Sequence, residues 1–329
     1  MKNIAIICGG YSGEYQVSIE SAATVHRNID KDKYKPYIIY VEKDKWFHKD
    51  DEGIEHYVNR NDFSLLVRNM PVKFDGVFNA IHGSPGEDGK ILAFFDTIGM
   101  LYTSCDTDLS ALTFNKYHCN HFLASLGIKV ARSVSFLKGE HIDKESVIDE
   151  LGLPLFVKPA RSGSSVGVSK VKTEEDFGNA VDVALNIDER IIIEEFLDGR
   201  EFGCGLFMGD KELKVLPLTE IIPKNDFFDF EAKYSGSMAD EITPPGNLKI
   251  DVEIDIKATS AMIYRKLGCK GVIRIDYMLS GTDLYLIEIN TVPGLSPASI
   301  IPQQAEIMGI SLKELFSTVI RQMFKGGNY

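Results

Sequence analysis

The chain has 329 residues, of which 44% are hydrophobic and 26% are charged, and its formal net charge is −12. This length suits two or three globular domains better than a single core. Such a negative charge argues against nucleic acid as a partner, because backbone phosphates would be repelled.

The N-terminus and the cysteines indicate the compartment. The first apolar run, residues 4–8, is too short for a signal peptide or a membrane span and predicts a buried strand. The five cysteines are widely spaced, their number is odd and no C-x-x-C occurs, so we expect reduced thiols. The sequence therefore predicts a cytoplasmic protein that makes no use of a membrane.

The N-terminal third alternates strands and helices. Strands are predicted over residues 3–8, 37–41 and 75–81, with one helix over 18–28 and another after the loop 82–89. Strand, loop, helix and strand in this order predict a parallel α/β domain. Ligands bind such domains at the carboxyl ends of the strands.

The remaining chain predicts two further domains of mixed α/β structure. We expect one helix over 109–126, a hairpin of strands 155–158 and 168–171, and then a helix over 174–185 and a strand over 190–195. Further on, strands 271–279 and 284–290 form another hairpin, which follows a long polar loop, 223–247. The predicted domains are therefore an N-terminal α/β substrate domain over 1–104, a central lid domain over 105–194, and a C-terminal domain with metal and substrate sites over 195–329.

The second hairpin carries the strongest chemical signal. Arg274 and Asp276 share one face of their strand, and Glu288 and Asn290 share one face of theirs. A three-residue turn centred on Thr282 would pair Asp276 with Glu288 and Arg274 with Asn290. Carboxylate and amide oxygens of this kind suit Mg²⁺ or Mn²⁺. A solvated face with cross-strand charge pairs is the alternative that these residues alone leave open.

A Gly/Ser-rich loop lies inside the first hairpin. The stretch KPARSGSSVGVSKV, residues 158–171, carries Lys158 at the end of an apolar strand, and Gly163 and Gly167 would let its backbone approach a ligand. It is not the G-x-x-x-x-G-K-[ST] phosphate loop. The composition still favours an anionic ligand, and a flexible surface hairpin is the alternative.

With these residues in view, the chain resembles the D-alanine–D-alanine ligases of the ATP-grasp superfamily. The resemblance runs nearly end to end, and the order of the motifs makes it specific. It is carried by GGYSGEYQVS at 9–18, HGSPGEDG at 82–89, KPARSGSSVGVSKV at 158–171, EEFLDGREF at 194–202, FEAKY at 230–234, GVIRIDYML at 271–279 and EINTVPGLSPASIIP at 288–302.

The resemblance implies a three-domain ATP-grasp fold with an N-terminal parallel α/β domain. It also implies a reaction in which ATP phosphorylates the carboxylate of one D-alanine and the amine of a second D-alanine attacks the acyl phosphate. The product is the dipeptide used in peptidoglycan. ATP and two Mg²⁺ or Mn²⁺ ions are the expected cofactors, and a homodimer is the expected assembly.

The resemblance assigns a role to each matching residue. The expected substrate residues are Glu14, which would pair with the first D-alanine's ammonium, His82, Arg274 and Ser299. The expected catalytic residues are Glu14, Ser164, Tyr234, Arg274, Gly294 and Ser299, with Arg274 and the Gly294 amide forming an oxyanion site. The nucleotide would contact Lys116, Lys158, Ser164, Glu194, Glu195, Leu197, Glu201 and Lys233. The metal ligands would be Asp276, Glu288 and Asn290.

Three alternative functions compete with the one that the resemblance implies. The first is a different second substrate. The relatives that make D-alanine–D-lactate carry a His-containing loop where Tyr234 stands, so Tyr234 favours an amine acceptor over D-lactate. The sequence does not distinguish D-alanine from D-serine as that acceptor. A dinucleotide-binding turn would require G-x-G-x-x-G, and Gly9, Gly10 and Gly13 have the wrong spacing. A protein that binds nucleotide without turnover is the third alternative, and the complete set of metal and phosphate positions argues against it.

Overall fold

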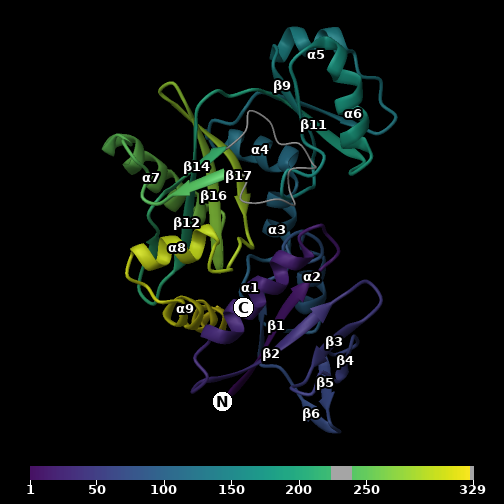
Figure 1. The fold of residues 1–329 in the computed structure, drawn as a ribbon, viewed down its shortest axis with the longest axis vertical. Helices are drawn as coiled ribbons and strands as arrows, with labels where there is room; N and C mark the ends of the chain where they lie inside the picture. The colour runs from purple at the N-terminus through teal and green to yellow at the C-terminus, as the bar shows by residue number, and fades with distance from the viewer. Residues whose placement is uncertain (224–238, 327–329) are drawn as a thin grey trace.

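The computed structural model describes residues 1–223 and 239–326. They form three sheets, each with its own helices (Figure 1). The N-terminal sheet lies at the bottom of Figure 1, the central sheet at the upper right, and the C-terminal sheet between them on the left. Tyr234 and Lys233 lie outside the described residues.

The N-terminal sheet has the order β6-β5-β4-β3-β2-β1-β7. Strand β1 is parallel to both β2 and β7, as predicted, and its continuous apolar run is buried, which is typical of a central parallel strand. The sequence missed an antiparallel extension formed by four short strands beyond β2. The elements are β1 (Lys2–Gly9), α1 (Tyr15–Asn28), β2 (Tyr34–Val41), β3 (Trp46–Lys49), β4 (Glu55–Asn59), β5 (Ser64–Val67), β6 (Met70–Val72), β7 (Gly76–Asn79) and α2 (Lys90–Thr97).

The helix predicted over 109–126 is wrong as one element. The chain forms α3 (Thr107–Phe114) and α4 (Lys116–Ser125), which meet at Asn115. Asn115 has an extended backbone, with ψ of 99°, and its side chain caps α4 by accepting from the His118 N–H. The break places Lys116 in the first turn of a new helix, and its N–H donates to the Ala160 carbonyl at 2.9 Å.

The central sheet has the order β10-β9-β11-β8 and carries α5 and α6 on one face. Strands β9 and β10 pair in antiparallel fashion, so the predicted hairpin around the Gly/Ser loop is confirmed. The predicted strand over 190–195 is also confirmed. The elements are β8 (Ser133–Leu137), α5 (Lys144–Leu151), β9 (Leu155–Pro159), β10 (Ser169–Val171), the 3-10 turn η1 (Glu174–Asp176), α6 (Phe177–Leu185) and β11 (Arg190–Glu195).

The C-terminal sheet has the order β15-β14-β12-β16-β17, with β13 paired to β12. The sequence identified β16 and β17, and missed the other strands and the helices of this part. The elements are β12 (Arg200–Met208), β13 (Leu213–Val215), β14 (Thr219–Pro223), β15 (Ala239–Ile242), α7 (Ile250–Lys266), β16 (Val272–Ser280), β17 (Asp283–Asn290), α8 (Ile300–Ile307) and α9 (Leu312–Lys325).

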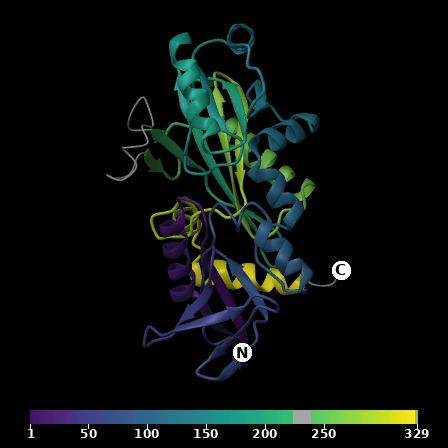
Figure 2. The same ribbon diagram turned by 90° about the vertical axis from the view of Figure 1, so that its right-hand side faces the viewer.

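Helix α9 joins the two ends of the chain. Its apolar side chains, among them Phe316 and Ile320, pack in one buried cluster with Ile4 and Ile6 of β1. Figures 1 and 2 both place α9 beside α1 of the N-terminal part. The N-terminal sheet and the C-terminal sheet therefore share a core.

Candidate active site

The β16–β17 hairpin places the predicted charged residues opposite one another. Asp276 pairs with Glu288, and Arg274 pairs with Asn290, as predicted. The assumed turn is wrong, because Ser280 pairs with Asp283 across a two-residue turn. A β-bulge after Asp276 makes up the one-residue difference, so the predicted pairs survive.

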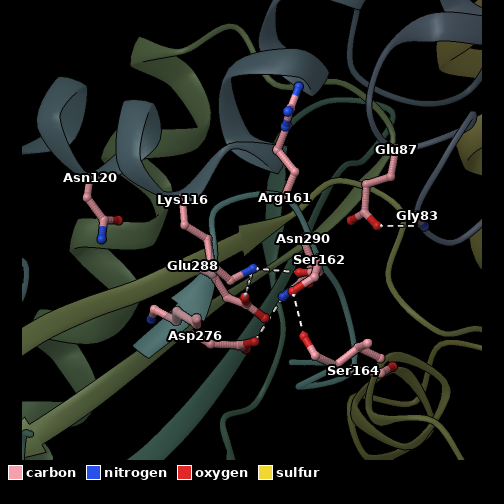
Figure 3. Close-up of polar contacts among 12 residues, drawn as sticks. Gly83, Glu87, Lys116, Asn120, Arg161, Ser162, Ser164, Asp276, Glu288 and Asn290 are labelled. Carbon is pink, nitrogen blue, oxygen red and sulfur yellow. Dashed lines mark hydrogen bonds and ion pairs between the residues drawn. The ribbon is translucent and has the colours of Figure 1, made fainter. Parts of the chain in front are cut away.

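Hydrogen bonds hold Asp276 rigidly. The Arg274 guanidinium donates to both of its oxygens at 2.7 Å, and Asn290 Nδ2 donates to Oδ2 at 2.9 Å. In Figure 3 the side chains of Asp276 and Asn290 lie beside those of Glu288 and Lys116. The hairpin thus presents a fixed set of oxygen atoms, partly balanced by Arg274.

The acidic groups here repel one another. Burial and the charges of Asp276 and Glu288 raise the pKa of Glu201 to about 8. Burial also raises the pKa of Asp276, against the opposite effect of Arg274. Burial would raise the pKa of Glu288 too, but the neighbouring Lys116 and Arg274 charges outweigh it and lower the pKa to about 2. Carboxylate oxygens gathered on one face of a sheet are hard donors, which suit a divalent cation.

No group of three or more His, Cys, Asp or Glu side chains among the described residues is arranged to hold a metal ion. The predicted ligand set does not require such a group, since its third member is the amide of Asn290. The residues present therefore fit Mg²⁺ or Mn²⁺, which bind proteins through a few oxygens and complete their coordination with water and phosphate.

Two lysines approach the hairpin from other elements. Lys116 Nζ lies 3.1 Å from Glu288 Oε2 and donates to the Ser162 carbonyl at 2.9 Å (Figure 3). Lys158, on β9, forms an ion pair with Glu194 on β11. Asn120 supports this pair from α4 by donating to Glu194 Oε1 at 3.1 Å. Both lysines are thus held at the site by acids.

The predicted hinge residues lie on and after β11. The Glu195 N–H donates to the Arg132 carbonyl at 3.0 Å, and its carboxylate accepts from Arg132 N at 2.9 Å and Nε at 2.7 Å. The Glu195 side chain is therefore committed to Arg132. Leu197 follows as a half-buried residue, and Glu201 lies on β12.

The Gly/Ser loop reaches the N-terminal part. Ser164 Oγ donates to Glu14 Oε1 at 2.6 Å, which confirms one of the two contacts predicted for Ser164. Its other predicted partner, Tyr234, lies outside the described residues. A Cβ on Gly163 would lie 2.5 Å from Glu14 Oε2, so only glycine fits there without displacing the carboxylate. Arg161 anchors the base of the loop by a two-pronged ion pair with Asp188.

His82 is buried between the N-terminal and C-terminal parts. Its Nδ1 lies 2.7 Å from the Val292 carbonyl, and its Nε2 lies 2.9 Å from Ser21 Oγ. Burial lowers the pKa of His82, with the Glu14 carboxylate opposing this and Arg274 supporting it. Both ring nitrogens are thus engaged within the protein, and the role of His82 beside the substrate stays a prediction.

Sequence reasoning missed Glu87. Its carboxylate accepts from the Gly83 N–H at 3.1 Å (Figure 3). It also accepts from the Val292 N–H at 3.4 Å. Burial, together with the charges of Glu14 and Glu288, raises its pKa to about 7. The signal was an acid inside HGSPGEDG, a loop at the carboxyl end of a predicted strand.

Gly294 and Ser299 lie close together after β17. A Cβ on Gly294 would lie 2.7 Å from Ser299 Oγ. Ser299 is the N-cap of α8, and its hydroxyl lies 2.9 Å from Ser296 Oγ. The start of α8 therefore offers hydroxyl and backbone donors, which favour a carboxylate ligand.

Comparison with known proteins decides the family. The family model "D-ala D-ala ligase N-terminus" matches residues 3–105, and "D-ala D-ala ligase C-terminus" matches residues 122–321. The chain belongs to the D-alanine–D-alanine ligase family. Its mixed α/β fold is the ATP-grasp fold of this family, as predicted. The D-alanine–D-alanine ligase of Flavobacterium johnsoniae is 46% identical over 97% of this chain and 98% of its own length.

Solved structures of the family agree with this fold. D-alanyl-alanine synthetase A from Vibrio cholerae matches with a TM-score of 0.89 and 26% identity over 98% of both chains. D-alanine–D-alanine ligase from Bacillus anthracis, complexed with ATP, matches with a TM-score of 0.79 and 25% identity over 99% of both chains. Within residues 1–223 and 239–326, no helix has the length and apolar character needed to cross a membrane.

Proposed function

We propose that this enzyme joins two D-alanine molecules to D-alanyl-D-alanine, with ATP as the energy source, for peptidoglycan precursor synthesis. The observation that carries this proposal is the contact between Ser164 and Glu14. It closes the Gly/Ser loop onto the N-terminal part, beside the hairpin of Asp276 and Glu288. In this proposal the loop and the hairpin together supply groups for an ammonium, a triphosphate and a metal ion.

The proposed reaction has two steps. A carboxylate oxygen of the first D-alanine attacks the γ-phosphorus of ATP, the bond to the β-phosphate oxygen breaks, and ADP leaves. The amine of the second D-alanine then attacks the acyl phosphate carbon, and inorganic phosphate leaves as the amine loses a proton. Glu14 would hold the ammonium of the first D-alanine, and Ser299 would bind the carboxylate of the second.

This chain's own residues supply charge and position. Lys116 and Lys158 would contact the phosphates of ATP, together with Lys233, while Glu194, Glu195 and Leu197 would line the adenine and Glu201 the ribose. Two Mg²⁺ or Mn²⁺ ions held by Asp276, Glu288 and Asn290 would neutralise phosphate charge.

The second step develops negative charge on an oxygen. Arg274 uses Nε and one terminal nitrogen on Asp276, which leaves its other terminal nitrogen for this oxyanion beside the Gly294 amide. Closure of the loop at Ser164 would keep water away from the acyl phosphate. Tyr234 would complete the contacts on the substrate side.

Further proposals concern organisation. We propose a substrate domain over 1–104, a lid domain over 105–194 and a C-terminal domain over 195–329, and the three separate sheets support this division. We also propose that the protein is a homodimer in the cytoplasm. We propose no nucleic acid partner, and the net charge of −12 supports this last point.

ADP release with D-alanine, L-alanine, D-serine and D-lactate, each supplied with ATP and Mg²⁺, tests the proposed function. We expect ADP release when D-alanine is the single amino acid supplied, and none when L-alanine is. Mass spectrometry of the D-alanine reaction should identify the dipeptide. Adding D-serine or D-lactate to D-alanine should yield little mixed product. Faster turnover with D-lactate or D-serine as the second substrate would overturn the dipeptide proposal.

A further inference from the structure

A buried chain of hydrogen bonds runs through Ser21, a residue of α1 that has no part in the function proposed above. Ser21 Oγ lies 2.9 Å from His82 Nε2 and accepts from the Leu295 N–H at 3.1 Å. His82 Nδ1 lies 2.7 Å from the Val292 carbonyl. Ser21 has no exposed surface, and His82, Val292 and Leu295 are each at most 5% exposed.

The partners fix where the protons are. The Val292 carbonyl can only accept, so His82 Nδ1 must carry a hydrogen. The Leu295 N–H can only donate, so Ser21 accepts there and uses its own hydrogen for His82 Nε2. Every polar atom of the chain is then satisfied, with His82 neutral.

A protonated His82 would break this arrangement. Its Nε2–H would then donate to Ser21, which already accepts from Leu295. The Ser21 hydroxyl hydrogen would have to find another acceptor in a buried place, and an unsatisfied buried donor is costly. The geometry therefore selects the neutral imidazole with its hydrogen on Nδ1.

The same bonds hold the backbone on both sides of Gly294. The Val292 carbonyl is bound by His82, the Val292 N–H donates to Glu87, and the Leu295 N–H donates to Ser21. All three partners belong to the N-terminal part, whereas segment 292–295 follows β17. The position of the Gly294 amide is thus set from across the interface between two parts of the molecule.

We propose that Ser21 is a positioning residue. It holds His82 as the neutral Nδ1–H tautomer, and through His82 and Leu295 it fixes segment 292–295, so that the Gly294 amide is aimed at the oxyanion. This inference rests on the proposed function, because the aim of the amide matters only if acyl transfer occurs there.

Ser21→Ala removes the hydroxyl alone. We expect kcat for dipeptide formation to fall about tenfold and the KM for ATP to stay unchanged. This loss is smaller than the roughly 10²–10³-fold loss of kcat when an oxyanion-hole donor is removed, because the Gly294 amide is still present. Thr24→Val is the matched control, since Thr24 is equally buried on α1 and its hydroxyl bonds stay within that helix. Equal kcat values in the two variants would overturn the proposal, as would a Ser21→Ala defect that appears only in the KM for ATP.

Nitrogen-15 NMR of the imidazole reports the tautomer directly in the protein without substrates. We expect wild type and Thr24→Val to show His82 protonated at Nδ1 alone, and Ser21→Ala to lose that single pattern. An unchanged His82 spectrum in a folded Ser21→Ala protein would refute the role of Ser21. This measurement needs no turnover, so it tests the His82 tautomer even if the wild-type protein forms no dipeptide. A wild type that forms no dipeptide would instead overturn the proposed function.

Discussion

Replacing Ser164 with alanine should loosen the closed loop without removing any charge. The Ser164–Glu14 bond is 2.6 Å long and ends on a carboxylate, and such bonds contribute about 1.5–3 kcal/mol. Because Ser164 is exposed, the lower end of this range applies, and about 1.4 kcal/mol corresponds to a tenfold change in equilibrium. The closed form should therefore lose about tenfold in population relative to the open form.

The assay measures phosphate and dipeptide in the same reaction. An open loop admits water to the acyl phosphate, so Ser164→Ala should release more phosphate than it makes dipeptide, whereas wild type should make them in equal amounts. Ser165→Ala is the matched control, because Ser165 is the next residue, is also exposed and shares the positive φ of Ser164, 54° against 48°. A phosphate-to-dipeptide ratio that stays equal in Ser164→Ala and Ser165→Ala would refute this reasoning.

Other predictions address the metal site, the loop and the periphery. Glu288→Gln should lower the rate of Mg²⁺-dependent ADP release at least about a hundredfold, because a bound metal ion contributes several kcal/mol to catalysis. Glu212 is exposed, so Glu212→Gln should leave that rate unchanged. Equal rates of ADP release in the two variants would contradict a ligand role for Glu288. Gly163→Ala should lower the rate of dipeptide formation, because its Cβ would lie 2.5 Å from a Glu14 oxygen, whereas Gly178→Ala, which meets nothing within 4 Å, should leave that rate unchanged. Hydrogen bonds to Asp50, the strongest of them from His56, hold the pKa of its carboxyl below the ordinary value of 3.8. The ionised Asp50 therefore stabilises the fold fully above about pH 3.8, and this stabilisation is lost as the pH falls from there toward the lower pKa of the folded state. Asp50→Asn should therefore lower the Tm at pH 7, and its difference from wild type should shrink toward pH 2; a constant difference would exclude the linkage.

Local patterns predicted the acidic hairpin and its faces, but not its turn or its bulge. Alternation fixed which side chains of β16 and β17 share a face, and the pairs Asp276–Glu288 and Arg274–Asn290 follow from that. The turn was misjudged by one residue, and the pairs survived because the bulge after Asp276 restored the register. A bulge of this kind has no clear local signal in the sequence. The predicted pairs were correct because the bulge offset the one-residue error in the turn.

Features that depend on distant contacts escaped prediction. The helix over 109–126 is broken at Asn115, a local N-cap residue that was passed over, and the Lys116 N–H freed by the break bonds the distant carbonyl of Ala160. Glu87 acquires its environment from Val292, 205 positions later. The strands β3–β6 are at most five residues long and separated by tight turns, so their periodicity is too short to detect.

Helix α9 has a consequence for the order in which the protein can fold during synthesis. Strand β1 is made long before α9, yet Ile4 and Ile6 share a buried cluster with Phe316 and Ile320 of α9. Helix α1 packs in the same cluster, but the part of this surface that α9 covers stays exposed on the ribosome until α9 has been translated. Exposed apolar surface of this kind invites aggregation, so the nascent N-terminal part is where we expect a chaperone to bind.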